Sequence, residues 1–324
     1  MLNDLELPDY IKPFLESEEM KRIKEIDMNC GMKETSVPLF LQADEYSRYT
    51  HSVNAAKIVH HFTHDKAQTL SALFHDIATP TFSHVIDFLH HDQMQQEDTE
   101  SLTHQFLAQS KTIPLRLKQL NLTIEQVDNY HLYTIADNDS PKLSSDRLEY
   151  TLGSLLTYHF ATSQDLEPIF NDLCVSKNEY GEDEIVFQHR KYASLFAKYA
   201  LQCGNIYSSK EDRYCMQLLA NILQQAQEEG ILSEEQFYTT ENNVITILKH
   251  SKLSLKWHDF NQIKGVVSSH EPKEGFLQIN VKRRYIDPYC LETKQRVSQY
   301  DEEVRSQQQA LLNAKYDEYL KGIK

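Results

Sequence analysis

Apolar residues recur at helical spacing along most of the first 240 positions of the chain. Met20, Ile23 and Ile26, for example, fall on one face of a helix. The same spacing predicts helices in 46–63, 65–76, from about 82, 102–109, 123–131, 146–160 and most of 164–229, the last broken by a turn at 177–184. Loops are expected at 30–45, with a short extended piece at 37–41, and in the polar stretch 90–101.

The pattern changes beyond residue 240. Segments that alternate or carry β-branched residues are predicted as strands, at 242–250, 261–269 and 275–286. The tail at 297–321 reads as a charged amphipathic helix, and eight glycines in 324 residues favour long helices over a many-stranded β fold. We therefore expect a mostly α fold, with a helical domain at residues 1–244 and a small C-terminal α+β lobe at residues 245–324.

The chain is acidic, with a formal net charge of −15, and has no long run of lysine and arginine. Extended nucleic-acid binding is therefore not expected, although a small phosphate substrate can still bind where positive charge is local. Five scattered cysteines without a C-x-x-C pair favour a reducing cytoplasm over a disulfide framework. The N-terminus lacks an apolar signal core, and no apolar run is long enough for a membrane span, so no membrane association is expected.

Candidate metal ligands stand on the predicted helices. His51, His75 and Asp76 lie within one stretch of the chain, and Asp146 follows seventy residues after Asp76. Two imidazoles and two carboxylates suit a divalent metal that keeps open positions for water and a phosphate oxygen. We expect one ion (iron, manganese, zinc, nickel or magnesium) in a metal-dependent phosphohydrolase.

Each of these residues also has a plainer explanation, which for His51 is a hydrogen-bonded histidine of the core. The chain contains four His-Asp dipeptides, of which three lie in polar contexts typical of a solvated surface. The fourth, His75-Asp76, follows the apolar run SALF, where the alternative is a hydrogen-bonded core pair. For Asp146 the alternative is a helix cap that forms a capping box with Glu149.

Three motifs resemble those of the HD-domain deoxynucleoside triphosphate triphosphohydrolases: RYTHS at 48–52, FHDIATPTFSHVID at 74–87 and DRLEY at 146–150. The resemblance covers roughly residues 45–195, and the segment ending in VKRRYIDP is similar to the C-terminal lobe of bacterial members. It implies an HD-type helical bundle, a metal on the four residues named above, and hydrolysis of a nucleotide or related phosphate ester (EC 3.1 class) by a metal-activated water. Oligomers are common among such enzymes, and the tail helix is a candidate contact for a homo-oligomer.

The resemblance also implies residues that bind the substrate. Arg48 and Arg147 would contact phosphates, and Tyr150 would pack on the sugar. Arg190, in FQHRKYA, is similar to a further phosphate contact, although a solvated face is the alternative for this residue.

A catalytic group is implied in the same way. His104, together with Asp87 and His84, would match the catalytic histidine and acid group of the family. His104, oriented by Asp87, would transfer a proton to the leaving oxygen. The alternative for His84 and Asp87 is a local pair on a helix surface, since they are three residues apart.

Several positions depart from the family pattern. Ala78 and Thr79 replace the glycine and histidine that usually follow the His-Asp-Leu run, Gln105 replaces the acid after the catalytic histidine, and Ser154 replaces an aspartate that reads the sugar 3′-hydroxyl. The predicted metal set is intact, whereas the groups that define a deoxynucleoside triphosphate are fewer. The adjacent histidine pairs His60-His61 and His90-His91 do not predict a second metal, because neighbours on a helix cannot both face the first site.

Three functions remain open at this point. The leading hypothesis is a phosphohydrolase for a nucleotide, with a triphosphohydrolase ahead of a nucleotide monophosphatase. The second is a nucleotide-binding regulatory protein that retains the metal site but has little turnover. The third is a purely structural helical protein, which predicts no tightly bound metal.

Overall fold

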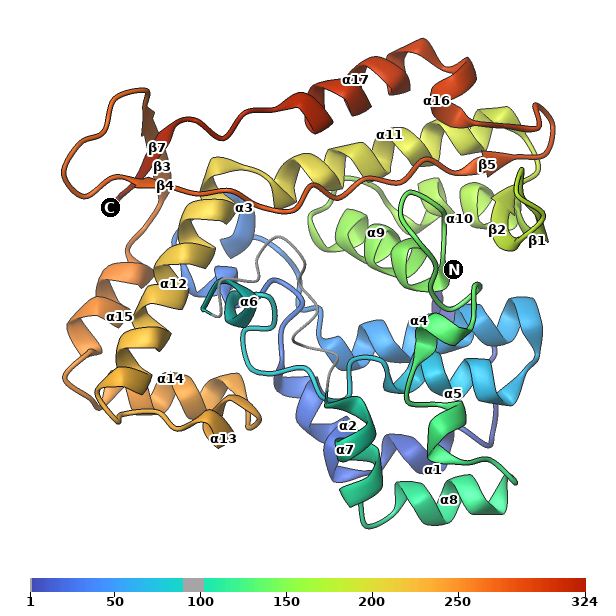
Figure 1. The fold of residues 1–324 in the computed structure, drawn as a ribbon, viewed down its shortest axis with the longest axis horizontal. Helices are drawn as coiled ribbons and strands as arrows, with labels where there is room; N and C mark the ends of the chain where they lie inside the picture. The colour runs from blue at the N-terminus through green and yellow to red at the C-terminus, as the bar shows by residue number, and fades with distance from the viewer. Residues whose placement is uncertain (1, 90–101) are drawn as a thin grey trace.

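Helices make up about 54% of the computed structural model, which describes residues 2–89 and 102–324 (Figure 1). The loop predicted at 90–101, which includes His90 and His91, lies outside the described residues. The mostly α prediction with a C-terminal α+β region is confirmed. None of the helices described here combines the length and the apolar character that crossing a membrane requires.

The helices follow one another in this order: α1 (Lys12–Leu15), α2 (Glu18–Arg22), α3 (Pro38–Leu41), α4 (Arg48–Thr63), α5 (Lys66–Phe74), α6 (Val85–Leu89), α7 (Thr103–Gln109), α8 (Ile113–Gln119), α9 (Ser145–Thr157), α10 (Ser163–Asn171), α11 (Arg190–Tyr207), α12 (Lys210–Glu228), α13 (Glu234–Phe237), α14 (Glu241–Lys249), α15 (Ser254–Asn261), α16 (Val297–Tyr300) and α17 (Glu302–Asn313). Short 3-10 helices are η1 (Leu2–Asp4), η2 (Ile23–Glu25), η3 (Met32–Glu34), η4 (Ile124–Gln126) and η5 (Tyr130–Leu132).

The strands form two small sheets. They are β1 (Leu173–Lys177), β2 (Asp183–Phe187), β3 (Gly265–Ser269), β4 (Leu277–Gln278), β5 (Tyr289–Cys290), β6 (Gln295–Arg296) and β7 (Tyr319–Ile323). One sheet has the order β1-β2-β5-β6 and the other β3-β7-β4. In the first sheet β2 and β5 are parallel and all other pairs in both sheets are antiparallel. The domain boundary at residue 245 stays a prediction. Strands β1 and β2, which precede it, lie in the same sheet as β5 and β6, which follow it.

Three helices position the candidate site, and capping residues fix where each begins. The side chain of Ser47 accepts from the backbone N–H of Thr50 at the start of α4, and Asp65 does the same for Gln68 at the start of α5. Ser144 caps α9. Helices α4 and α5 pack against each other, and α9 packs on α4 (Figure 1). The caps therefore set which turns of α4, α5 and α9 face one another.

Apolar clusters surround this junction on several sides. One lies between α4, α5 and the short helices of the first 26 residues and of 102–127. A second joins α9, α10, α11 and the first sheet to α17. A third is built around α12, with α6, α14 and α15. The candidate site thus stands on helices that share these clusters, with α4 and α5 in the first and α4 and α9 in the second.

Some predicted elements are wrong in type. Residues 242–250, predicted as a strand, form α14, because Val244, Ile245 and Leu248 share one buried helical face and their burial outweighs the strand preference of the β-branched residues. The extended piece expected at 37–41 is α3, which starts with Pro38 in the first turn, where proline costs no hydrogen bond.

Other predictions missed strands. The turn expected within 164–229 is the tip of the β1–β2 hairpin, in which Gly181 takes a φ of +78°. Of the strand predicted at 275–286, only β4 is regular, and the tail helix ends at Asn313, after which the chain forms β7. The pairing of β4 with β7 and of β2 with β5 joins distant segments, which the local pattern does not contain.

The irregular segment between β4 and β5 runs along α11 (Figure 1). Its backbone lies so close to this helix that a Cβ at Gly204 would overlap the carbonyl oxygen of Arg284. Arg213 donates to the carbonyl of Ile279 at 2.8 Å, and the backbone N–H of Asp287 donates to the carbonyl of Pro141 at 2.9 Å. The segment is therefore held against both α12 and the loop that precedes α9.

Glu241, the first residue of α14, bonds to two loops, one that follows η2 and one that precedes α6. Its Oε1 accepts the backbone N–H groups of Asp27 at 3.3 Å and Phe82 at 3.1 Å. Burial, with the nearby charge of Asp27, raises the pKa of Glu241 to about 8. Near neutral pH, much of this side chain is therefore protonated.

We expect Gly204→Ala to destabilise the protein, although alanine is ordinarily the better helix former. The added methyl group would force the 279–288 segment off α11, at an overpacking cost of about 1–3 kcal/mol. Thermal or urea unfolding measures the change. Gln202→Ala, on the exposed side of the same helix, is the control, and a variant at 204 that is as stable as this control would contradict the close approach.

Glu241→Gln is expected to stabilise the protein more at pH 8 than at pH 5. The pKa of Glu241 is higher in the folded chain than in the unfolded chain, so its contribution is complete below about pH 4.5 and is lost as the pH rises through about 8. Glutamine keeps the accepting oxygen and carries no charge. Tm measured at both pH values tests this, with Glu302→Gln on an exposed position as the control; equal shifts at the two pH values would refute it.

Candidate metal centre and its cavity

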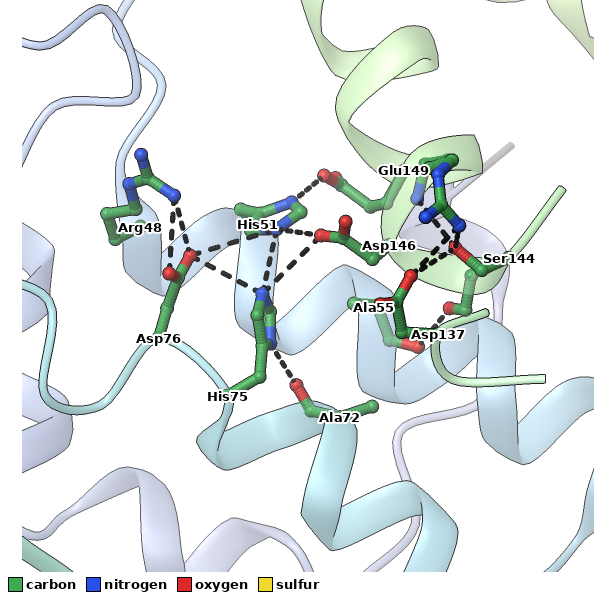
Figure 2. A network of polar contacts seen from close by, with 12 residues as sticks. Arg48, His51, Ala55, Ala72, His75, Asp76, Asp137, Ser144, Asp146 and Glu149 are labelled. Carbon is green, nitrogen blue, oxygen red and sulfur yellow. Dashed lines mark hydrogen bonds and ion pairs between the residues drawn. The ribbon is translucent and has the colours of Figure 1, made fainter. Parts of the chain in front are cut away.

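The four predicted metal ligands come together at the junction of α4, α5 and α9 (Figure 2). His51 lies in the second turn of α4, His75 and Asp76 follow the last turn of α5, and Asp146 lies in the first turn of α9. The first three are buried, whereas the Asp146 side chain is 22% exposed. Residues more than seventy positions apart thus point to one place.

The ligand atoms have the spacing of a coordination shell. The Nε2 atom of His51 lies 3.0 Å from Nε2 of His75, 3.0 Å from Oδ1 of Asp146 and 3.8 Å from Oδ2 of Asp76. The Nε2 atom of His75 lies 3.4 Å from Asp76 and 3.6 Å from Asp146. Metal–ligand bonds of about 2.0–2.2 Å place neighbouring donor atoms roughly 3–3.5 Å apart. His51, His75 and Asp76 form a buried group that could hold a metal ion, and Asp146 is close enough to both imidazoles to complete it.

The Nδ1 atom of each imidazole, on the side of the ring away from the proposed metal, has a hydrogen-bond partner. Nδ1 of His75 donates to the carbonyl of Ala72 at 2.7 Å, and Nδ1 of His51 bonds Oε2 of Glu149 at 2.5 Å (Figure 2). When both rings are neutral, as metal ligands must be, these bonds direct the lone pairs of the two Nε2 atoms toward each other across 3.0 Å. Two lone pairs at that distance repel unless a cation lies between them, and the same outer bonds are typical of metal-binding histidines.

The surrounding charges also favour a cation. Burial alone would lower the pKa of His51, but Glu149 and Asp146 together raise it to about 10, so that without a metal a proton occupies this ring and a bound metal ion would displace it. Burial would raise the pKa of Asp76, but Arg48 and then the two imidazoles hold it far below its usual range. The carboxylates thus stay ionised and attract a positive ion to the space between them.

Arg48 fixes the Asp76 carboxylate. Its Nη1 contacts the two oxygens of Asp76 at 3.0 and 3.2 Å, and its Nε donates to Oγ of Ser83 at 3.1 Å. Phe82 and Ser83 both have positive φ angles, of +60° and +45°, which are unfavourable for side chains of this kind. The bend after Pro80 therefore holds strained backbone in the conformation that brings Ser83 to Arg48.

Thr79 also holds Asp76. Its hydroxyl donates to Oδ1 of Asp76 at 2.8 Å. The residue that departs from the family pattern thus contacts a predicted ligand and does not disturb the metal set.

Sequence reasoning missed the part played by Glu149. Its fully buried carboxylate bonds Nδ1 of His51, accepts from the hydroxyl of Tyr46, and accepts from Nδ2 of Asn54 at 3.0 Å. The capping box considered for Asp146 and Glu149 is wrong, because Ser144 caps α9. The available signal was spacing, since positions 146 and 149 lie on the same side of a helix.

A cavity of about 920 Å³ opens beside these residues. Nine of the sequence-predicted site residues line it: Arg48, His51, His75, Asp76, His84, His104, Asp146, Arg147 and Tyr150. Residues that the sequence did not single out also line it, among them Tyr46, Phe88, Tyr130, Tyr158, Tyr207, Asp212, Lys282 and Arg284. The wall is therefore rich in aromatic rings and carries basic groups from distant parts of the chain.

The predicted catalytic group is paired differently from the expectation. Asp87, fully buried, bonds Nδ1 of His84 at 2.8 Å, whereas Nδ1 of His104 bonds Asp128 at 2.6 Å. The prediction that Asp87 orients His104 is thus wrong, because Asp87 serves the histidine one turn away. The surface-pair alternative for His84 and Asp87 is also wrong, since Asp87 is buried and His84 lines the cavity.

Arg284 contacts the second nitrogen of His84. Its Nη2 lies 3.3 Å from Nε2 of the ring. Burial lowers the pKa of His84, and the charge of Arg284 lowers it further against the opposing effect of Asp87. The ring therefore favours its neutral form, with the proton on Nδ1 toward Asp87 and a lone pair toward Arg284.

The other predicted binding residues differ in position. Arg147 is held by Asp137 at 3.0 Å and by Asn138 and Ser144, and it still lines the cavity. Tyr150 packs edge-on against Tyr207 with ring centroids 6.3 Å apart. Within the described residues Arg190 is not part of the cavity wall, because it is exposed at the start of α11 and its guanidinium lies over the ring of Tyr300.

Comparison with known proteins gives a fold. No family model matches the chain. It is 23% identical over 206 residues to the uncharacterized protein YdhJ of Bacillus subtilis (strain 168), a match that spans 64% of this chain and 62% of the length of YdhJ.

Two solved structures share the architecture. One is a phosphohydrolase from Bacteroides thetaiotaomicron VPI-5482, with a TM-score of 0.65, 15% identity and coverage of 98% of this chain and 96% of the other. The second is a hypothetical protein from Aquifex aeolicus, with a TM-score of 0.64, 14% identity and coverage of 93% and 90%. The chain therefore has a fold found in a phosphohydrolase, over nearly its whole length.

Proposed function

We propose that this chain is a metal-dependent phosphohydrolase of the HD type that acts on a nucleotide or a related phosphate ester. The observation that carries the proposal is the pair of Nε2 atoms that face each other at 3.0 Å, with both outer nitrogens bonded to acceptors. The fold of a phosphohydrolase over most of the chain supports it. The ion would be held by His51, His75, Asp76 and Asp146.

A divalent ion at this site would supply a water of lowered pKa and polarise a phosphoryl oxygen, so that water can attack phosphorus. The residues of the chain provide the remaining parts of the site. Arg48 and Thr79 keep Asp76 in place, and Glu149 orients His51. His84, held by the buried Asp87, is placed on the cavity wall to exchange a proton with the leaving group.

A nucleotide is the substrate class that suits the cavity. Its volume of about 920 Å³ lies within the range of small-molecule sites, and five tyrosines and Phe88 offer faces for a base or sugar. A deoxynucleoside triphosphate is the leading candidate by resemblance. Ser154, at the position that usually reads the 3′-hydroxyl, shares a hydrogen bond of 2.7 Å with Tyr207, so this pair is the candidate for that contact.

A nucleotide-binding regulatory protein is the second candidate. The observation that favours it is the contact of Arg284 with Nε2 of His84, which occupies the atom that proton transfer would need. Nucleotide hydrolysis by the metal-loaded protein would favour the phosphohydrolase, and nucleotide binding without hydrolysis would favour the regulatory protein.

His75→Ala and Asp146→Ala are expected to lose both bound metal and turnover, because each removes a donor atom from the shell. The measurements are elemental analysis and phosphate release from a panel of nucleoside triphosphates and monophosphates, on manganese-loaded protein. His61→Ala, an exposed histidine on the same helix as His51, is the control. Metal without turnover in the parent protein would favour the regulatory function, and a parent protein that binds no metal at any pH would refute the metal site.

Glu149→Gln is expected to weaken metal binding by about 10- to 100-fold without abolishing it, because loss of the carboxylate lowers the basicity of His51. Competition with a chelator measures the affinity. The amide fills the same buried space, but its NH2 group cannot accept from the donors that now bind the carboxylate, so a lower unfolding temperature is expected as well. An affinity equal to that of the parent would show that Glu149 does not act on the ligand.

A further inference from the structure

One side of α9 follows the cavity wall away from the metal ligands. Asp146, Tyr150 and Ser154 on this helix, and Tyr158 just after its last residue, all line the cavity. They are four residues apart and therefore lie in one row along the helix. At roughly 1.5 Å of rise per residue, the row extends about 18 Å. The proposed metal lies at the Asp146 end, so a ligand that also reaches Tyr158 has to be an extended molecule.

Asp212 of α12 brings a carboxyl group to the Tyr158 end of this row. It lines the cavity, and its charge acts on the Tyr158 hydroxyl and on the Cys30 thiol, which line the cavity too. Met216, one turn further along the same face of α12, is also part of the wall. The carboxyl group thus stands beside an aromatic ring, a thioether and a thiol, which are surfaces that suit a flat base.

The position of Asp212 in α12 usually gives an acid a different contact. Ser209 is the N-cap of this helix, and Asp212 is the third residue after it, where an acid commonly bonds back to the backbone N–H of the cap residue. Asp165 makes this bond at the same position of α10, with Oδ2 2.9 Å from the backbone nitrogen of Thr162. The carboxyl oxygens of Asp212 have no hydrogen-bond or ion-pair partner in the part of the chain that the structure describes. They are open to the cavity instead.

Two polar groups close to Asp212 already have other partners. The Tyr158 hydroxyl donates to Oδ1 of Asn29 at 2.6 Å. Arg213, the next residue of α12, donates to two backbone carbonyls and, at 2.7 Å, to Glu318. Neither group therefore satisfies the carboxyl of Asp212.

The acidity of Asp212 reflects this lack of partners. Burial raises its pKa to about 7, against the opposing charges of Arg284 and Arg213. The pKa values of Cys30 and Tyr158 are also raised by burial, so both of these neighbours are neutral near pH 7. The carboxylate has lost water without gaining a hydrogen bond, and a ligand that donates N–H groups would supply the missing bonds.

We propose that Asp212 is a specificity-determining residue that reads the base of the substrate, and that this base has two adjacent N–H donors, as guanine has at N1 and at its 2-amino group. An ionised carboxylate offers only acceptors and can take both donors side by side. Adenine, cytosine and thymine present donors next to acceptors, so each would set a lone pair against the carboxylate. The inference rests on the proposed function and deepens it, because it places the phosphates at the metal and names the base at α12.

The test uses manganese-loaded full-length protein with dGTP, dITP, dATP and dXTP at pH 8, where most of the Asp212 carboxyl is ionised. Kd is measured by calorimetry, and chromatography then checks whether the nucleotide is intact; where it is hydrolysed, kcat/KM measures the preference. The parent protein should prefer dGTP to dITP by about 10- to 100-fold, because hypoxanthine lacks the 2-amino group and loses a hydrogen bond to a charged acceptor. It should bind dATP no more tightly than dITP.

Asp212→Asn should change which base is preferred. The amide has the size of the carboxylate but presents a donor beside an acceptor, which suits xanthine, with N1–H next to a 2-oxo group, and opposes the 2-amino group of guanine. The variant should lose dGTP affinity by about 10- to 100-fold and prefer dXTP to dGTP, with metal content unchanged. An equal loss for all four nucleotides would indicate a structural role and would overturn the proposal.

Glu211→Gln is the matched control. It removes the same charge from the same turn of α12, but Glu211 lies 3.9 Å from Lys210 and outside the cavity lining found in the described residues. Its preference for dGTP should stay within twofold of the parent protein. A parent that does not prefer dGTP to dITP, a parent that prefers dATP, or an Asp212→Asn variant that keeps the dGTP preference would each overturn the proposal. Base preference without hydrolysis counts against the proposed function alone, whereas hydrolysis without base preference counts against Asp212.

Discussion

Two imidazole nitrogens held face to face across 3.0 Å are the constraint on which the site depends. Each ring is fixed from behind, one by a buried carboxylate and one by a backbone carbonyl, so neither can turn its lone pair away. The arrangement is unfavourable without a positive charge at its centre and favourable with one. The energetic cost of holding it is met by the surrounding apolar clusters and by the bonds of Arg48, Thr79 and Glu149 to the ligands.

The four proposed ligands could be placed near one another from the sequence because their motifs stand on predicted helices. The phase of α4, α5 and α9 sets where His51, His75 and Asp146 lie, and the capping residues at the start of each helix are readable from the sequence. Glu149 was visible in the same pattern but was assigned to a cap, because sequence alone does not show whether a carboxylate faces solvent or an imidazole.

The rest of the site depends on contacts that local patterns do not contain. His104 bonds Asp128 and not Asp87, a choice set by how α7 packs against the 123–133 region. Arg190 is excluded because α11 begins at the edge of the first sheet, away from the cavity. The segment that bears Arg284 was predicted as a strand. It is irregular beyond β4, and it is held by the side chain of Arg213 and by close packing against Gly204 of α11.

The pairing of β3 and β4 with β7 has a consequence for how the site is completed during synthesis. All four ligand residues have been made once the ribosome has passed position 146, and their helices pack mainly through contacts between α4, α5 and α9. The wall that carries Arg284 lies between β4, which pairs with β7 at residues 319–323, and β5, which pairs with β2 and β6. A nascent chain therefore contains all four proposed ligand residues before the wall that completes the cavity, and the β4 end of that wall gains its partner β7 when residues 319–323 have been made.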